Sequence, residues 1–293
     1  MPHVMIVVSP ISSVDSSRGL NSSNMASTKA LRLPLAAHEF DMKLRHRHPY
    51  LEPHLDDSFV PFAHRGGFKE LPENSRAAFS AAFDVGFRYL ETDVQLTKDG
   101  NLVAFHDPNL LRTCGIDRDI STMTVDEVSS ALIDGREPVP LLADLLEALP
   151  EAMFNIDAKS DATVDVLIGF LERTKSLDRV CIGSFSHRRL ARIRKAFGPK
   201  VCTSASPREV ALWLLGSAVP GPSCLQIPPR QSIIQIATAS RIARSTAMGL
   251  PVHVWTIDDP VSMQRLIDIG VHGIMTDEAH TLRQVAERNQ LWK

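Results

Sequence analysis

Short apolar runs alternate with stretches of helical periodicity from residue 60 to the end of the chain, and this alternation constrains the fold most strongly. Strands that alternate with helices usually lie parallel and are joined by crossover helices. Eight such repeats favour an α/β fold closed into a TIM (β/α)8 barrel over an open sheet. The predicted strands cover residues 61–66, 87–94, 154–158, 180–185, 200–204, 224–227, 252–257 and 273–276.

The segments between these strands have the apolar spacing of helices. A chain of 293 residues, 44% of them hydrophobic, is long enough for one such barrel. We expect the barrel to span residues 60–293, with a short loop-rich excursion at 109–140 that contains one short helix. Further helices are predicted over residues 141–149, 164–174, 190–197, 208–215, 233–248, 261–269 and 279–289.

The first 59 residues differ in composition from the rest. Serines cluster at 12–23, so we expect a disordered extension, and translation could also start later, at Met25 or Met42. The apolar run at 4–8 is too short for a signal peptide. No apolar run approaches the roughly 18 residues of a membrane span, and a net charge of −2 argues against a nucleic-acid partner.

Four cysteines are present, and none has the paired spacing of a metal-binding motif. Cys181, Cys202 and Cys224 lie within apolar, strand-like runs, which is typical of small buried residues. Such free cysteines suit a reducing compartment, so we expect a cytoplasmic protein.

Residues 62–113 carry most of the polar groups of chemical interest. Pro72, Glu73 and Asn74 have the composition of a helix start, and Asp99-Gly100 is a strong hairpin signal. A two-residue loop at 99–100 would place Asp93 directly opposite His106 and bring Glu91 to the same face. An exposed polar hairpin is the simpler interpretation for any one of these residues, but it is less suitable for the whole set.

These motifs together resemble the glycerophosphodiester phosphodiesterase family. The resemblance rests on HRG at 64–66, PEN at 72–74, ETDVQLTKDG at 91–100 and FHD at 105–107, in that order and spacing. It continues through NIDAK at 155–159 and WTI at 255–257, and it covers roughly residues 60–293. The resemblance implies the same barrel, of the type found in phospholipase C-like phosphodiesterases.

A barrel of this kind holds its functional groups where the strands end. His64 and Arg65 end the first predicted strand, and Glu91 and Asp93 end the second. The same position on later strands is taken by Asp157, Lys159 and Trp255. Polar groups buried at several strand ends on one rim predict an active site.

Carboxylates and cations at this rim point to phosphodiester chemistry. Glu91, Asp93 and Asp157 offer oxygen ligands, which suit one divalent cation such as Mg²⁺ or Ca²⁺, with Mn²⁺ also possible. The family usually has Glu where this chain has Asp157, which leaves the choice of metal open. Arg65 and Lys159 are suited to grip the phosphate, and the resemblance suggests that Trp255 forms a wall on the substrate side.

His64 and His106 are predicted to share the proton transfers as general acid and base. The family implies that a neighbouring glycerol hydroxyl attacks and forms a cyclic phosphate, whereas the residues alone equally allow attack by water. Glu73 and Asn74 are ordinary helix-start residues, and Asn74 could in addition orient His64 or a phosphate oxygen.

The favoured function is metal-dependent hydrolysis of glycerophosphodiesters to glycerol 3-phosphate and an alcohol. One alternative is a lysophospholipase D-like enzyme that acts on lipid phosphodiesters, and such an enzyme would need an exposed apolar rim around its mouth. Another is a barrel that binds phosphodiesters without hydrolysing them, which the intact pair of histidines disfavours.

Overall fold

Eight parallel strands form the centre of the computed structural model, which describes residues 48–56 and 59–292. Their order is β8-β7-β6-β2-β1-β13-β12-β9, and a parallel bridge between Ser204 and Cys224 connects the two outer strands. The predicted (β/α)8 barrel is therefore confirmed. The strands are β1 (Val60–His64), β2 (Tyr89–Leu96), β6 (Met153–Ala158), β7 (Val180–Gly183), β8 (Cys202–Thr203), β9 (Leu225–Ile227), β12 (Val252–Val254) and β13 (Gly273–Thr276).

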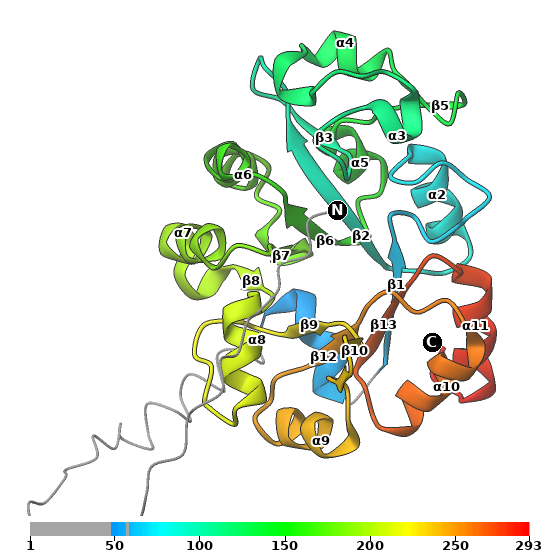
Figure 1. The fold of residues 1–293 in the computed structure, drawn as a ribbon, viewed down its shortest axis with the longest axis vertical. Coiled ribbons are helices and arrows are strands. Elements are labelled where there is room, and N and C mark those ends of the chain that lie inside the picture. Colours follow the sequence, from blue (N-terminus) through cyan, green and yellow to red (C-terminus); the bar gives the residue numbers. More distant parts are fainter. Residues whose placement is uncertain (1–47, 57–58, 293) are drawn as a thin grey trace, which may run out of the picture.

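Helices surround these strands on the outside (Figure 1). Several begin directly after a strand at a serine or aspartate whose side chain accepts a backbone N–H of the first turn, as Ser160, Ser206 and Asp259 do. The helices are α2 (Arg76–Asp84), α5 (Leu142–Ala148), α6 (Asp161–Thr174), α7 (His187–Phe197), α8 (Pro207–Leu214), α9 (Ala239–Ala247), α10 (Pro260–Asp268) and α11 (Ala279–Arg288), with short 3-10 turns η3 (Leu177–Arg179) and η4 (Gly198–Lys200). None of the helices in the described residues is long and apolar enough to cross a membrane.

The excursion after β2 is a small folded unit beside the barrel (Figure 1). Its own apolar cluster includes Leu110, Ile120, Val128 and Ile133. It contains β3 (Leu102–Ala104), α3 (Leu111–Cys114), η2 (Ile120–Thr122), α4 (Val125–Ser129), β4 (Leu132–Ile133) and β5 (Glu137–Pro138). Because it follows β2, it lies next to the end of the barrel where the predicted site residues gather.

The long helix predicted over residues 233–248 is wrong in its first half. A hairpin of β10 (Arg230–Gln231) and β11 (Ile234–Gln235) turns at Ser232, whose φ is 54°, and α9 begins only at Ala239. The side chain of Ile233 is 90% exposed. In the sequence, an exposed isoleucine looks the same as one that packs a helix against the core. The apolar spacing therefore predicted a helix where the structure has a hairpin.

The boundary predicted at residue 60 is too late. Residues Pro49–Asp56 form a 3-10 helix, η1, in which Tyr50 and Leu51 are buried in the same apolar cluster as Phe62 and Tyr89. The hydroxyl of Tyr89 donates to the Tyr50 carbonyl at 2.6 Å. Residues 48–56 therefore belong to the described fold, and the disorder predicted for residues 1–47 concerns residues outside the described part.

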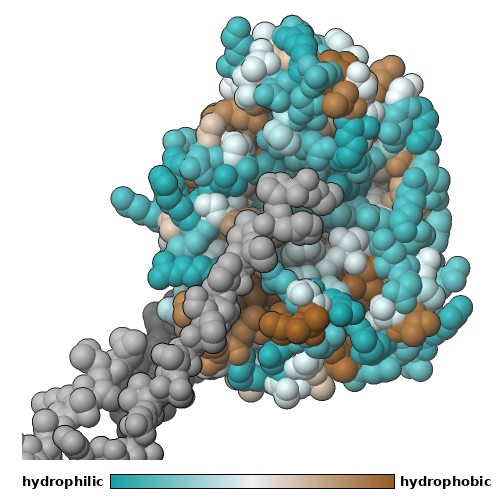
Figure 2. Space-filling view, viewed as in Figure 1, coloured by the Kyte–Doolittle hydropathy of each residue, from teal (hydrophilic) through white to brown (hydrophobic). Residues whose placement is uncertain are grey.

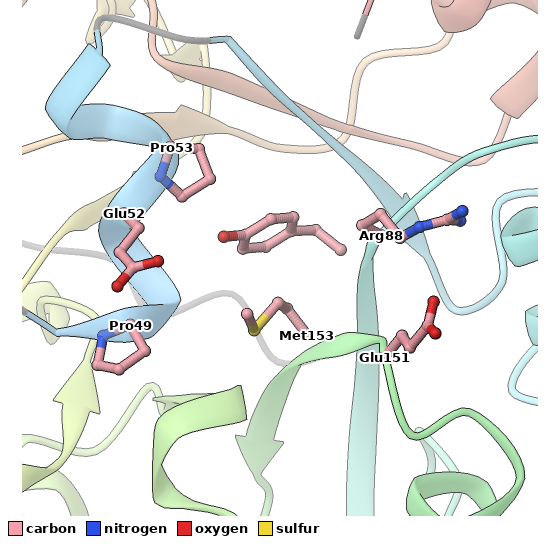
Figure 3. Close-up of a pocket in the computed structure, with 7 residues that line it drawn as sticks. Pro49, Glu52, Pro53, Arg88, Glu151 and Met153 are labelled. Atoms are coloured by element: carbon pink, nitrogen blue, oxygen red, sulfur yellow. The ribbon is translucent and has the colours of Figure 1, made fainter.

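This N-terminal segment closes the amino-terminal end of the barrel, here called the floor. A pocket of about 350 Å³ lies on the outer side of the floor between η1 and the starts of β2 and β6, with Glu52, Arg88, Glu151 and Met153 on its walls (Figure 3). The opposite end of the barrel, called the mouth, holds the predicted site residues.

Candidate active site

The strand register brings the predicted carboxylates and histidine to one level of the mouth. His64 ends β1 and is paired with Glu91 of β2, and Asp93 of β2 is paired with Asp157 of β6. Glu91, Asp93 and Asp157 are all buried. This arrangement agrees with the prediction that these groups meet where the barrel strands end.

The two-residue hairpin predicted at 99–100 is wrong by one residue. The β2–β3 register pairs Leu96 with Leu102, and the backbone N–H of Phe105 donates to the Asp93 carbonyl. His106 is therefore not opposite Asp93. The longer turn is held by local and by distant contacts. Thr97 Oγ1 donates to Asp99 Oδ1 at 2.6 Å, and Asp99 also accepts the backbone N–H of Val125 at the start of α4.

His106 nevertheless remains near the carboxylates. It follows β3 past the end of the ladder, where its backbone carbonyl accepts Gln95 Nε2 at 2.9 Å. Its charge is among the influences that lower the pKa of Asp93. His106 therefore lies at the mouth as predicted, but it is not the cross-strand partner of Asp93.

Buried negative charge is concentrated on β2. Burial, followed by the neighbouring charge of Asp93, raises the pKa of Glu91 to about 7. Burial acts in the same direction on Asp93, but the positive charges of Lys159 and Arg65 outweigh it and hold the pKa of Asp93 below its ordinary value. The pKa values of Glu91 and Asp93 are thus shifted in opposite directions, because the side-chain charges of Lys159 and Arg65 lie against Asp93.

Lys159 and Arg65 supply these charges by direct contact. Lys159 Nζ lies 2.7 Å from both Asp93 Oδ1 and Asp157 Oδ2, and Arg65 Nε lies 3.0 Å from Asp93 Oδ2. Burial would lower the pKa of Lys159, but Asp157 and Asp93 outweigh it and raise that pKa. Both predicted phosphate-binding residues therefore lie among the carboxylates and remain charged.

A carboxylate outside the predicted set orients His64. Asp277, the residue after β13, lies 2.7 Å from His64 Nδ1, while Glu91 Oε2 lies 3.7 Å from Nε2. Burial would lower the pKa of His64, but Glu91 and Asp277 outweigh it, and the pKa is raised. The one signal in the sequence for Asp277 is its place directly after the last predicted strand.

The second histidine has a similar support. His106 Nδ1 lies 2.6 Å from Asp107 Oδ1, and Arg112 Nε lies 2.5 Å from Asp107 Oδ2. Arg112 also holds Glu73 at 2.6 Å, and Glu73 contacts Arg65 at 3.3 Å. Arg112 comes from α3 of the excursion and not from the end of a barrel strand. The rule that functional residues lie at strand ends therefore could not predict its contacts with Asp107 and Glu73.

Asn74 does not start a helix as predicted. Helix α2 begins at Arg76 with Ser75 as its cap, and Asn74 has a left-handed backbone with φ of 56°. Its side chain donates to Asp93 Oδ2 at 3.3 Å and accepts Thr92 Oγ1 at 2.8 Å. Asn tolerates this backbone better than most residues, and the conformation turns its amide toward the carboxylates.

The glycines after His64 allow the first loop of the mouth to fold tightly. Gly66 has φ of 100°, and a Cβ there would lie 2.4 Å from Cβ of Ala78 in α2. Arg65, just before it, also has a positive φ of 48°. A non-glycine residue held in this region is strained, and such strain is common where a side chain must be aimed at a ligand.

A polar cavity of about 220 Å³ opens beside these groups, and it could accommodate a small phosphodiester. Trp255 lies elsewhere on the rim, against the 66% exposed ring of Phe185 at a centroid distance of 5.9 Å. The cavity is lined by His64, Arg65, Phe68, Lys69, Leu71, Glu73, Arg112, Thr113, Asp134 and Asp277.

The carboxylates fit a hard divalent cation in their chemistry. They form an all-oxygen donor set, and Asp157 Oδ1 is buried without a hydrogen-bond partner. Their oxygens are not gathered as closely as ligands around an ion, because Lys159 lies between Asp93 and Asp157. Within the described ranges, the one group of three ligand atoms within 4.8 Å of one another is a set of cysteines at the floor.

Comparison with known proteins supports the same chemistry. The model of the glycerophosphoryl diester phosphodiesterase family matches residues 64–281. A Mycobacterium tuberculosis protein named Probable glycerophosphodiester phosphodiesterase 2 is 36% identical over 80% of this chain and 92% of its own length. A Caldanaerobacter subterraneus protein named glycerophosphodiester phosphodiesterase is 30% identical over 75% of this chain and 94% of its own.

A solved structure supports the fold. A phosphodiesterase from Oleispira antarctica, in complex with the product sn-glycerol-3-phosphate, is 23% identical and superposes with a TM-score of 0.67. The match covers 80% of this chain and 98% of that one. With the family match and the relatives above, this chain belongs to the glycerophosphoryl diester phosphodiesterase family and is a phosphoric diester hydrolase.

Proposed function

We propose that the enzyme hydrolyses small glycerophosphodiesters with the help of one divalent cation and two histidines. The observation that carries this proposal is the pairing of each histidine with its own carboxylate, His64 with Asp277 and His106 with Asp107. A carboxylate on one ring nitrogen fixes the orientation of the imidazole and leaves the other nitrogen for proton transfer.

The reaction requires two proton transfers. As the P–O bond to the alcohol breaks, one histidine takes the proton of the attacking hydroxyl and the other gives a proton to the leaving oxygen. The hydroxyl belongs either to water or to the glycerol part of the substrate. Each transfer typically contributes about 10²–10⁴-fold in rate.

Arg65 and Lys159 are proposed to bind the phosphate oxygens. The planar guanidinium of Arg65 is held by Asp93 and Glu73, so it is oriented before substrate arrives. Lys159 is a compact charge whose position is fixed by two carboxylates. Glu73 and Asn74 act as positioning residues, since each contacts Arg65 or Asp93 from a loop.

Glu91, Asp93 and Asp157 are the proposed ligands of the cation. When bound, Mg²⁺, Ca²⁺ or Mn²⁺ would supply positive charge that stabilises negative charge on the phosphate in the transition state. Burial, followed by the charge of Asp93, raises the pKa of Glu91 to about 7, and a cation beside this carboxylate would favour its charged form.

The test is release of sn-glycerol 3-phosphate from glycerophosphocholine, measured before and after EDTA and after each cation is added back. We expect activity to disappear with EDTA and to return with at least one cation. Activity that EDTA leaves unchanged would contradict the cation requirement, and no turnover of any small glycerophosphodiester would contradict the substrate class.

Apolar groups on the mouth favour a lysophospholipase D-like activity as a second candidate function. Phe185 is 66% exposed and contacts Trp255, and the β10–β11 hairpin after β9 exposes Ile233 and Ile234. Figure 2 shows apolar patches in the lower half of a largely polar face, where Figure 1 places this hairpin with α8 and α9.

An apolar rim of this kind could hold one acyl chain of a lysophospholipid. If it does, Ile233→Ser should lower kcat/KM for lysophosphatidylcholine and leave kcat/KM for glycerophosphocholine unchanged. Leu215→Ser is the matched control, because Leu215 is 82% exposed but follows the last turn of α8, at the floor end. Equal effects of the two substitutions would exclude a lipid-binding role for the hairpin.

A further inference from the structure

Three cysteines from three neighbouring strands meet inside the barrel near its floor. Cys181 belongs to β7, Cys202 to β8, and Cys224 precedes β9 directly. All three side chains are fully buried, and their sulfur atoms lie within 4.8 Å of one another. They are reduced in this structure, and the proposed hydrolysis at the mouth does not use them.

The sulfur spacing agrees with a metal–thiolate centre. Cys181 Sγ lies 3.8 Å from Cys224 Sγ. Tetrahedral zinc with Zn–S bonds of about 2.3 Å separates its sulfur ligands by about 3.8 Å. Packed thiols without a metal can approach to a similar distance, so spacing alone does not distinguish a metal site from a core of small apolar side chains.

A candidate fourth ligand lies beside the cluster. His253 of β12 is fully buried, and its imidazole interacts with the thiol of Cys224. Its ring nitrogens are not among the ligand atoms that lie within 4.8 Å of one another, so the ring would have to move toward the other two sulfurs to bind the same ion. Three cysteines and one histidine form a ligand set that is common in structural zinc sites. Oxygen ligands, which Mg²⁺ and Ca²⁺ require, are not part of this group.

A buried hydroxyl gives independent support for a ligand at this place. Tyr50 of η1 is fully buried, and its hydroxyl oxygen has no hydrogen-bond partner. The three thiols are among the groups that interact electrostatically with it. A buried hydroxyl without a partner costs about 1–3 kcal/mol, whereas a metal-bound thiolate beside it would be a good acceptor.

The cluster also spans a junction of the barrel with little strand pairing. Strand β8 has two residues, and a single bridge from Ser204 to Cys224 pairs its end with the start of β9, supported by the backbone bonds from Ala205 to Cys224 and from Ser223 to Thr203. One ion held by Cys181 and Cys202 on one side and by Cys224 and His253 on the other would cross-link this junction. Such a brace would have a structural role at the end of the barrel opposite the mouth.

We propose that Cys181, Cys202, Cys224 and His253 form a binding site for a thiophilic cation, zinc in the first place, which braces the barrel where β8 meets β9. Each thiol that becomes a ligand releases its proton, so the site exchanges protons for the ion with no oxidation or reduction. This site is separate from the proposed cation site at the mouth, which offers carboxylate oxygens alone.

The first test is the metal content of the full-length protein purified from zinc-supplemented cells. We expect about one zinc ion per chain that resists brief EDTA treatment, and its loss in Cys202→Ala. Cys114→Ala is the matched control, since Cys114 lies in the excursion outside the cluster. Zinc content that is equal in the two variants would overturn the proposal.

A spectroscopic test does not depend on any variant folding. Wild-type protein refolded with Co²⁺ should show the intense near-ultraviolet absorption of sulfur-to-cobalt charge transfer, which carboxylate ligands at the mouth cannot produce. Absence of this absorption, with four reactive thiols after denaturation, would show that the cysteines are only packed. Fewer than four reactive thiols without bound metal would reveal a disulfide and also overturn the proposal.

Tyr50→Phe distinguishes the two states of the site. If zinc is bound and its thiolates accept the Tyr50 hydroxyl, removal of that hydroxyl should lower the thermal midpoint of the zinc-loaded protein. If no ion binds, the same change removes an unsatisfied buried hydroxyl and should raise the midpoint. A raised midpoint in protein purified with zinc would therefore contradict the proposal.

Discussion

The mouth and the floor of this barrel are built from the same strands but bury different kinds of side chain. At the mouth, Glu91, Asp93 and Asp157 are buried beside Lys159 and Arg65. At the floor, the interior contains thiols, Tyr50, Tyr89 and apolar groups. The mouth therefore depends on balanced charges, and the floor depends on close packing.

The two ends consequently respond differently to change. Removal of one charge at the mouth leaves its partner buried and unpaired, and the effect falls on chemistry first. Removal of volume at the floor leaves a cavity, and the effect falls on the free energy of unfolding. We expect activity and stability to separate along the barrel axis.

The largest expected effect on stability is at the floor. Tyr50→Ala removes a fully buried aromatic ring and should lower the free energy of unfolding by about 4 kcal/mol. The folded fraction should keep its kcat, because Tyr50 is at the opposite end from the histidines. Urea unfolding and kcat per active site would measure both, and a large fall in kcat would show that the two ends are coupled.

Glu91→Gln tests the charge balance at the mouth. Because Glu91 has a pKa of about 7 when folded and a lower one when unfolded, its stabilising contribution is full at low pH and is lost as the pH rises through about 7. In EDTA at pH 8, Glu91→Gln should therefore stabilise the protein, on the order of 3 kcal/mol, while activity with any cation is lost. Urea unfolding at pH 5 and pH 8 would measure the sign, and a destabilised variant at pH 8 would contradict it.

Asp277→Asn tests how the mouth orients His64. The amide keeps the shape but loses the charge that lies 2.7 Å from His64 Nδ1, so kcat should fall by about 10–100-fold while KM changes little. Steady-state kinetics with glycerophosphocholine would measure this split. A change confined to KM would assign Asp277 to substrate binding instead.

The smallest predicted effect is a single hydrogen bond at the floor. Tyr89→Phe removes the donor to the Tyr50 carbonyl, a bond of 2.6 Å, and should cost about 1 kcal/mol of stability. Activity should not change. A cost as large as that of Tyr50→Ala would mean that this bond, rather than packing, attaches η1 to the barrel.

The barrel and the rim residues could be predicted because they depend on local patterns. Eight apolar runs alternate with helices, and strand-end positions follow from each run, as for His64 and Asp157. The groups that complete the site come from other parts of the chain. Arg112 reaches it from the excursion, and Asp277 pairs with a histidine 213 residues earlier.

The errors arose where a distant contact overrides a local preference. Asp99 accepts the backbone N–H of Val125 in α4 and does not close a two-residue turn, and Asn74 has a left-handed backbone with its amide on Asp93. Tyr50 is buried at the floor of the barrel, although it lies in the segment for which disorder was predicted. None of these contacts with distant residues can be predicted from a short window of sequence.

The most direct test of the central claim is the rate of sn-glycerol 3-phosphate release from glycerophosphocholine by wild type, His64→Ala and His106→Ala, each with saturating cation. The account predicts that each substitution lowers kcat by about 10²–10⁴-fold with the thermal midpoint nearly unchanged. A His106→Ala enzyme with unchanged kcat would contradict the two-histidine mechanism.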